Sequence, residues 1–389
     1  MSIKPSIRLP YLIVYAIAAN LLHFILPIPP IVLRSTWLLL IIYGFCKYIK
    51  FGLNNFEKAF CIFAIYNMIH FVMSLMSSPM STTEIGATIL ISLTFVVFGI
   101  MGRLGKLDDK FFWIAGVLLI VVGIPAYYHE EQVRLVKLMM MGSTADQTTV
   151  NASTLFLMIL PIVFVIKKKL TSIGIFIVCL FFIILSAKRG NIAAAAVPAV
   201  LYIYIVYESA NKTFFKRFLI TLAIVVVASY AWESIINNEY LVSRYEDTLE
   251  GKTSGRNDIY FSFWKLWSEG SNAWQFYFGF GYHGTLIYGS DGRFAHQDWL
   301  EILVDFGLVG LILYLSAFIC FYKLFRRTER MDCKFTMLSI LAIWLCKASI
   351  SMGFTDERFA IMAIPYGYVM CKSFKRKIIN KTETNANYR

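Results

Sequence analysis

Long apolar runs, separated by shorter polar connections, are the dominant pattern of this chain. Twelve of them approach the roughly 20 residues that a helix needs to cross a membrane. The runs are about Tyr11–Ile28, Ile31–Tyr48, Ala59–Met76, Ile85–Met101, Phe111–Tyr128, Ala152–Ile166, Leu170–Leu185, Ile192–Tyr207, Phe218–Trp232, Trp299–Tyr322, Phe335–Met352 and Phe359–Cys371. The sixth, ninth and twelfth are the shortest. The pattern predicts an all-α polytopic membrane protein with about 12 transmembrane helices.

One polar segment is far longer than the other connections and separates the ninth run from the tenth. It extends from Asn237 to Asp298, and a loop of this length in a compact protein is expected to be functional or to contain secondary structure of its own. Apolar residues recur there with helical spacing, after Ser254 as a candidate N-cap. They are Ile259, Tyr260, Phe263, Trp264 and Trp267. This spacing predicts an amphipathic helix that lies on the membrane surface.

The end of the loop contains start signals for the tenth transmembrane helix. Asp298 followed by Glu301 resembles a capping box, and Trp299 is suited to anchor a helix at the membrane interface. The chain is therefore expected to have four parts. They are transmembrane helices 1 to 9 over residues 1–236, an outward loop over residues 237–298, transmembrane helices 10 to 12 over residues 299–372 and a cytoplasmic tail over residues 373–389.

Composition and charge support this topology. Hydrophobic residues make up 58% of the 389 residues, whereas a soluble domain has about half. Most of the 37 Lys and Arg lie at the N-terminus, in every second connection and in the C-terminal tail, and basic residues collect on the cytoplasmic side of membrane proteins. Both termini are therefore expected in the cytoplasm and the long loop outside. Because topology accounts for the net charge of +13, no nucleic acid partner is needed.

The chain shows no pattern typical of metal or cofactor chemistry. Its seven cysteines lie in or beside apolar runs and indicate neither a disulfide framework nor a zinc site. It lacks a P-loop, a Ser–His–Asp signature and an outward pair of aspartates that could hold a metal against a nucleotide sugar. We therefore expect no metal and no cofactor. A site supplied by arginines instead suits a donor with a good leaving group, such as a lipid pyrophosphate.

Three residues are the main candidates for chemistry. His296 directly precedes the tenth run, at the water–membrane boundary, where a neutral imidazole can take a proton from a hydroxyl. Arg189, in an outward turn next to Gly190, has the planar guanidinium that suits phosphate, and Arg256 lies at the start of the amphipathic helix. Each has an alternative role: an interfacial side chain for His296, lipid headgroup contact for Arg189 and a helix-start ion pair for Arg256.

Further residues are candidates for substrate contact. Lys347 lies inside the eleventh run, and an ionisable residue at membrane depth is a functional candidate unless it is paired. Asp356 or Glu357, in the next turn, could form that buried pair. The other candidates are Lys188, Arg293, Asp298, Glu301 and Tyr260. Gly307 and Gly310, in the tenth run, are expected to permit close helix packing.

Three segments resemble motifs of the O-antigen ligase and polymerase superfamily of bacterial envelope glycan enzymes. The first is His296-Gln297, followed after nine residues by Gly307 and after two more by Gly310, which is similar to a His-[Asn/Ser/Gln]-nine-Gly-two-Gly pattern. The second is Ser186-Ala187-Lys188-Arg189-Gly190, which is similar to a Ser-x-x-Arg-Gly turn. The third is Ser254-Gly255-Arg256 with Trp264, which is similar to a Gly-Arg…Trp segment. The resemblance covers about Thr171 to Leu315, with departures at Asp298 and Leu311 that leave the subtype open.

The resemblance implies a membrane-embedded glycosyltransferase that uses sugar chains linked to undecaprenyl pyrophosphate in the periplasm. Arg189 and Arg256 would hold the pyrophosphate, and His296 would activate or position the acceptor hydroxyl. The protein would lie in the bacterial inner membrane. Its partners would be the lipid-linked oligosaccharide and the bilayer, with a chain-length regulator as a further partner.

Three functions remain open from the sequence. A Wzy-type polymerase of O-antigen or capsular repeat units is preferred, because the segment from His296 to Glu301 and the modest chain length resemble polymerases. A ligase would instead transfer the glycan to lipid A-core. A flippase or transporter is the alternative of another class, but no inverted repeat is visible in the sequence.

Overall fold

The computed structural model describes residues 8–26, 28–75, 83–140, 150–186, 188–209, 256–289 and 292–373, with a few isolated residues between 229 and 242. Within these residues the secondary structure is helical, without a strand. Seven of the described helices are long and apolar enough to cross a membrane, and three shorter ones are also apolar. The prediction of an all-α polytopic membrane protein is confirmed. The ninth predicted run, Phe218–Trp232, lies outside the described ranges.

The helices follow the apolar runs of the sequence. In chain order they are α1 (Arg8–Leu21), α2 (Pro30–Tyr48), α3 (Asn55–Leu75), α4 (Thr83–Arg103), α5 (Asp109–Met140), α6 (Ser153–Ile159), the 3-10 turn η3 (Leu160–Phe164), α7 (Lys169–Leu185), α8 (Arg189–Ser209), α11 (Arg256–Ser268), α12 (Ala273–Phe278), α13 (Gly284–Tyr288), α14 (Asp298–Arg326), α15 (Met331–Ile350), the 3-10 turn η4 (Glu357–Met362) and a last helix over residues 363–373. α5 continues about three turns beyond Tyr128, because the polar residues that end the apolar run are themselves good helix formers.

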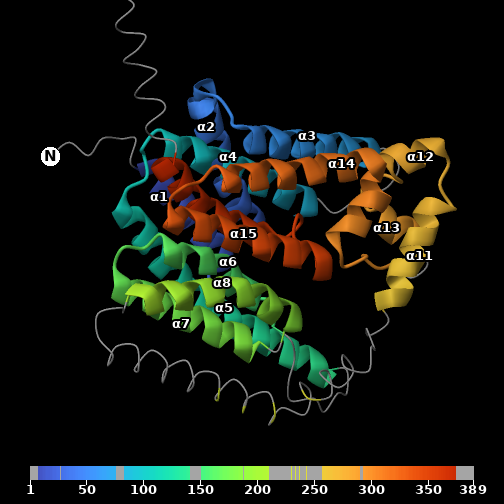
Figure 1. Ribbon diagram of the computed structural model, residues 1–389. Helices are drawn as coiled ribbons and strands as arrows, with labels where there is room; N and C mark the ends of the chain where they lie inside the picture. Colours follow the sequence, from blue (N-terminus) through green and yellow to red (C-terminus); the bar gives the residue numbers. More distant parts are fainter. Residues whose placement is uncertain are drawn as a thin grey trace, which may run out of the picture.

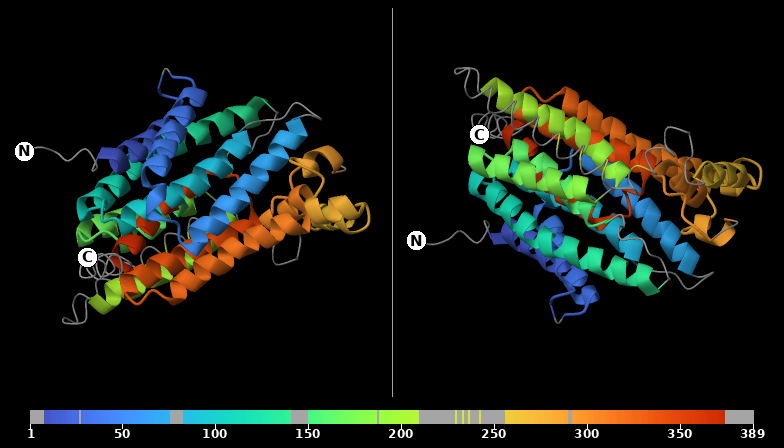
Figure 2. Two further views of the ribbon diagram at one scale, coloured as in Figure 1. Left: turned by 90° about the horizontal axis from the view of Figure 1, so that it is seen from above. Right: turned by 90° about the horizontal axis from the view of Figure 1, so that it is seen from below.

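The helices form an elongated bundle with a small helical cap at one end (Figure 1, Figure 2). α3 and α14 lie side by side and antiparallel, because Phe56 packs against Phe321 while the Tyr66 hydroxyl donates to the Phe306 carbonyl at 3.0 Å. α5, α7 and α8 form the opposite flank in Figure 1, and α15 packs on both α8 and α14. The cap consists of α11, α12 and α13, so the described part of the long loop is helical, as expected.

The sixth and twelfth predicted runs lie in the centre of the bundle. The sixth forms α6 and η3, the twelfth forms most of η4 and the helix after it, and residues 152–166 and 359–371 are all buried. Neighbouring helices rather than lipid surround them, so they do not need the length of an isolated span, and irregular backbone is tolerated. Their N-terminal ends meet inside the bundle, where Arg358 donates to the carbonyl of Asn151 at 2.7 Å.

α14 is kinked at Gly307, which has a φ of 65°. A kink frees carbonyl groups that a straight helix would bond internally, and the cap uses them: the N–H of Phe280 donates to the Val304 carbonyl at 2.8 Å. Gly310 faces α3, where an added Cβ would lie 3.3 Å from the Tyr66 ring. Close helix packing, expected at both glycines, therefore applies to Gly310, whereas Gly307 lets the cap dock on α14.

The predicted capping box at the start of α14 is wrong. The N-cap is Gln297, whose side chain caps no backbone N–H, and the side chains of Asp298 and Glu301 are buried. The Glu301 carboxylate accepts hydrogen bonds from the N–H of Ala295 at 2.7 Å and from the hydroxyl of Thr285. A capping pattern predicts local partners, but these carboxylates have partners in other segments that only the folded chain brings close.

The predicted amphipathic helix is present as α11, and much of its apolar face packs against protein. Phe263 and Trp267 are buried in a small cluster with Ala295 and residues of α14. Trp264, from the same predicted face, is 50% exposed. The candidate N-cap, Ser254, lies outside the described residues. α11 is thus held by the segment that leads into α14, which places its first residue, Arg256, close to that segment.

Candidate active site

A cavity of about 1110 Å³ lies where the cap meets the bundle. Its walls come from the start of α8, the start of α11, the segment before α14, the turn after α15 and the facing parts of α1 and α5. Five residues singled out in the sequence line one side, which we call the cationic half. They are Lys188, Arg189, Arg256, His296 and Lys347. Tertiary structure thus gathers candidates from four separate segments at one site.

The donor set of the cationic half suits an anion. Lys188 donates to the side-chain oxygen of Asn151 at 2.8 Å and Arg256 to the carbonyl of Ile350 at 3.0 Å, so both have neutral partners. α8 begins at Arg189, and the N-terminus of a helix adds partial positive charge and free N–H groups. In the described ranges, no group of three or more His, Cys, Asp or Glu is placed to hold a metal ion.

Lys347 is the most buried of these cations. Its side chain is 3% exposed and lines the cavity, and no described residue forms a hydrogen bond or ion pair with it. The predicted alternative of a pair with a neighbouring acid is not what the structure shows, because Asp356 pairs with Arg358 and Glu357 pairs with Arg34. The charges of Asp356 and Asp298 act on this ammonium without forming an ion pair with it, and a buried ammonium without a close counter-ion is costly, so an anion in the cavity would stabilise it.

Burial lowers the pKa of Lys188 from its ordinary 10.5 to about 7, and the positive charges of Lys347 and Arg358 act in the same direction. The amine therefore changes its charge near neutral pH. A bound anion would favour the protonated form, so its binding would be coupled to proton uptake.

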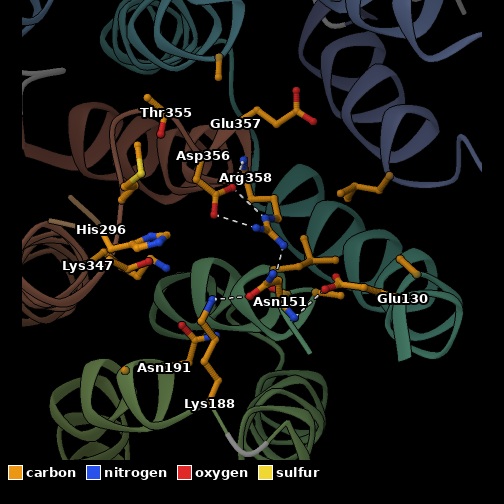
Figure 3. A pocket seen from close by; sticks show the side chains of 18 of the residues that line it. Glu130, Asn151, Lys188, Asn191, His296, Lys347, Thr355, Asp356, Glu357 and Arg358 are labelled. Atoms are coloured by element: carbon orange, nitrogen blue, oxygen red, sulfur yellow. Dashed lines mark hydrogen bonds and ion pairs between the residues drawn. The ribbon is translucent and has the colours of Figure 1, made fainter. Parts of the chain in front are cut away.

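His296 projects into the cavity beside Lys347 (Figure 3). Its backbone is in the left-handed region, with a φ of 54°, which turns the chain into α14. The chain is anchored on both sides of His296: the N–H of Ala295 donates to Glu301, and the carboxylate of Asp298, two residues further on, accepts from the N–H of Gly353 at 2.7 Å. The imidazole is therefore positioned by buried hydrogen bonds on either side of it.

Electrostatics favour the neutral form of His296. Loss of solvation lowers its pKa below the ordinary 6.5, and the nearby charges of Arg256 and Lys188 lower it further. At neutral pH the ring is free to accept a proton, as general base catalysis requires. His283, the other histidine of the loop, lies outside this cavity and lines a separate small hollow with Glu301 and Asp305.

A wall of hydrogen-bonded groups crosses the cavity, and the sequence analysis, which named Asp356 only as a partner for Lys347, did not predict it. Asp356 holds Arg358 through two contacts, of 2.7 and 2.9 Å, and Arg358 in turn bonds to Asn151 (Figure 3). Burial opposes ionisation of Asp356, but the guanidinium beside it holds the pKa of that carboxyl below its usual range. Three successive ionisable residues at 356–358 are a sequence signal for such a feature. Nothing in the sequence around Asn151 indicates that this residue takes part in the wall.

Four other candidates from the sequence do not line the cavity. Asp298 and Glu301 are buried among protein partners, Arg293 is exposed, and Tyr260 is half-buried on α11. The geometry gives the two carboxylates a part in positioning His296 rather than in contacting substrate. It does not bring Arg293 or Tyr260 to the cationic half.

Fold and site together define a multi-pass membrane protein with a cation-lined cavity beneath a helical cap. Residues 174–315, about a third of the chain, match the family Wzy_C, described as O-antigen ligase. This segment is thus similar to the O-antigen polymerase and ligase superfamily, in the region where its motifs predict the resemblance. No curated protein matches the chain in sequence. The matched segment includes Lys188, Arg189, Arg256 and His296, whereas Lys347 and the Asp356–Arg358 wall lie beyond it.

Proposed function

We propose that this protein is a membrane glycosyltransferase that polymerises repeat units of O-antigen or capsular glycan carried on undecaprenyl pyrophosphate, at the periplasmic face of the bacterial inner membrane. One observation carries the proposal. Lys188, Arg256 and Lys347, which have no acidic partner among the described residues, face the same cavity as His296. Such a site suits a donor whose leaving group is a diphosphate and an acceptor whose hydroxyl must lose a proton.

The residues of the cationic half would act as follows. The acceptor oxygen attacks the anomeric carbon, and the bond from that carbon to the diphosphate oxygen breaks with its electron pair on the diphosphate. The fixed positive charges stabilise the developing negative charge, which is the largest contribution in many such sites. His296 takes the proton of the acceptor hydroxyl. The anchored backbone around His296 holds the ring in position for this transfer.

Ligation to lipid A-core is the second candidate, and the similarity of residues 174–315 to the O-antigen ligase family favours it. The chemistry at His296 would be the same, and only the acceptor would differ. A flippase is not favoured, because the family match concerns ligases. We prefer the polymerase for the resemblance of the His296 to Glu301 segment.

What accumulates in a His296→Ala strain separates the two enzymes. Loss of a polymerase leaves lipid A-core capped with a single repeat unit, because an intact ligase still attaches it. Loss of a ligase leaves bare core and long chains on the lipid carrier. We expect core with one repeat unit. Normal ladders would assign His296 to the helix end, and His283→Ala, in the same loop but outside the cavity, is the matched control.

The proposed orientation has its own test. A reporter inserted after Gly289, in the cap, should lie in the periplasm, and one inserted after Arg327, at the end of α14, should lie in the cytoplasm, together with both termini. Finding the two reporters on one side of the membrane would contradict the orientation and remove the cavity from the periplasmic face.

A further inference from the structure

The cavity continues past Arg358 into a second part whose walls come mainly from the end of α1 and the turn after it, from α2 and α5, and from Glu357. Figure 3 shows Asp356 and Arg358 between His296 on one side and Glu130 on the other. We call this part the neutral half. Its lining residues that matter for the argument are Asn20, His23, Phe24, Arg34, His129 and Glu357. They lie outside the segment that matches the family.

Charges in the neutral half are compensated within the protein. Arg34 and Glu357 form an ion pair at 3.0 Å, and Asn20 donates to the same carboxylate at 3.1 Å. Glu130, at the edge, pairs with Arg134 at 3.2 Å. This half therefore differs from the cationic half, where three cations form no ion pair with an acidic side chain of the described ranges. It offers no net charge for a second phosphate.

The groups that remain suit an uncharged, hydroxyl-rich ligand. The rings of Phe24 and His129 stack with their centroids 4.0 Å apart, which provides a flat apolar surface. Around them, the Arg34–Glu357 pair and the Asn20 amide supply both donors and acceptors. A pocket that combines apolar surface with a few placed polar groups recognises ligands by orientation as well as by contact.

The volume of the cavity also suits a ligand that carries sugar rings. Pockets of roughly 300–1,000 Å³ hold drug-sized ligands, and this cavity is about 1110 Å³. A diphosphate held by the cationic half would occupy a small part of that volume. The cavity as a whole is therefore large enough for a diphosphate and the sugar rings joined to it.

We propose that the neutral half binds the uncharged saccharide that the lipid diphosphate carries, and so selects substrates by their sugars. This inference rests on the proposed function, because it assumes that the cationic half holds the diphosphate. It adds α1, α5 and Glu357 to the binding site. The wall of Asp356 and Arg358 then lies between the diphosphate and the sugar rings.

Binding of two lipids to the purified full-length protein tests this proposal. The probes are undecaprenyl diphosphate alone and undecaprenyl diphosphate-linked repeat unit isolated from cells that make the glycan. The double variant Arg34→Gln/Glu357→Gln removes both charges of the pair together, and His129→Leu removes the stacked imidazole. Each should weaken binding of the sugar-bearing lipid about tenfold, the scale of one lost hydrogen bond to a charged group, and change binding of the bare lipid less than about twofold.

Two further variants separate the possible failures. Arg256→Gln should weaken both lipids alike, and if it weakens neither, the proposed function fails rather than the saccharide site. Lys265→Gln/Glu269→Gln breaks a comparable pair on the exposed face of α11 and should change neither. If the neutral-half variants weaken both lipids equally, this half holds the diphosphate or its lipid. If they weaken neither while folding normally, the saccharide lies elsewhere. Either result overturns the inference.

Discussion

The carboxylate of Asp298 accepts a hydrogen bond from the backbone N–H of Gly353 at 2.7 Å and so joins the His296 segment to the turn after α15. Its second oxygen accepts from the hydroxyl of Tyr314 at 2.7 Å, and that hydroxyl accepts from the indole N–H of Trp344 at 2.9 Å. The side chain of Asp298 is fully buried. This network fixes the two walls of the cavity between which His296 projects.

Asp298→Ala should destabilise the protein and slow transfer together. The N–H of Gly353 and the hydroxyl of Tyr314 would lose their acceptor in a buried place, which costs about 1–3 kcal/mol for each unsatisfied group. Thermal unfolding in detergent and the rate of glycan transfer measure the two effects. Asp298→Asn keeps one acceptor oxygen, so it should lose less stability and less transfer activity than Asp298→Ala. An unchanged unfolding temperature and rate in the Ala variant would show that the network does not position His296.

Gly307→Ala should destabilise the cap. Gly307 has a φ of 65°, and a Cβ there would lie 2.5 Å from the backbone of Tyr277, so the cost combines backbone strain of about 1–3 kcal/mol with a steric clash. Protease cleavage within α11 to α13 should become faster. Gly174→Ala in α7 is the control, because a Cβ there meets nothing within 4 Å. Equal resistance of the two variants to the protease would show that the kink at Gly307 does not hold the cap on α14.

Arg189→Ala and Arg256→Ala should each lower glycan transfer about 10²-fold or more while the protein still inserts into the membrane, since removal of one charge-stabilising donor has effects of that order. Lys at either position should restore little activity, because a point charge does not reproduce the two-pronged guanidinium. Arg293→Ala, in the same loop but outside the cavity, is the control for surface charge. Full activity of either Ala variant would assign that arginine to lipid contact.

Affinity for undecaprenyl diphosphate should fall as the pH rises through neutrality. Burial and the charges of Lys347 and Arg358 bring the pKa of Lys188 to about 7, so above that pH the free protein lacks a proton that the complex favours. For one proton the affinity falls by up to about tenfold per pH unit. The Lys188→Arg variant, whose side chain stays charged, should bind undecaprenyl diphosphate with an affinity that changes little with pH in this range. A pH profile that is the same for both proteins would contradict the assignment.

The chain by itself determined the membrane class, most of the helices and the resemblance of residues 174–315 to the O-antigen ligase family. Apolar runs of sufficient length form helices in a membrane whatever their neighbours, because every backbone group must be bonded internally. Short motifs likewise marked Arg189, Arg256 and His296, since each is a local pattern. The same local reasoning misassigned Asp298 and Glu301 to a capping box, because the spacing is right for a cap and the sequence does not show the donors that fold against them, such as the N–H of Gly353 and the hydroxyl of Thr285.

Tertiary structure alone decided how the cavity is built. Arg358 and Asn151 are 207 positions apart, and they meet because two short runs pack in the centre of the bundle and both begin there. Lys347 became a cation facing the cavity rather than half of an ion pair, because its two acidic neighbours in sequence are held by Arg358 and Arg34. Which charge pairs with which depends on distance in space and on burial, and neither quantity can be read from spacing along the chain.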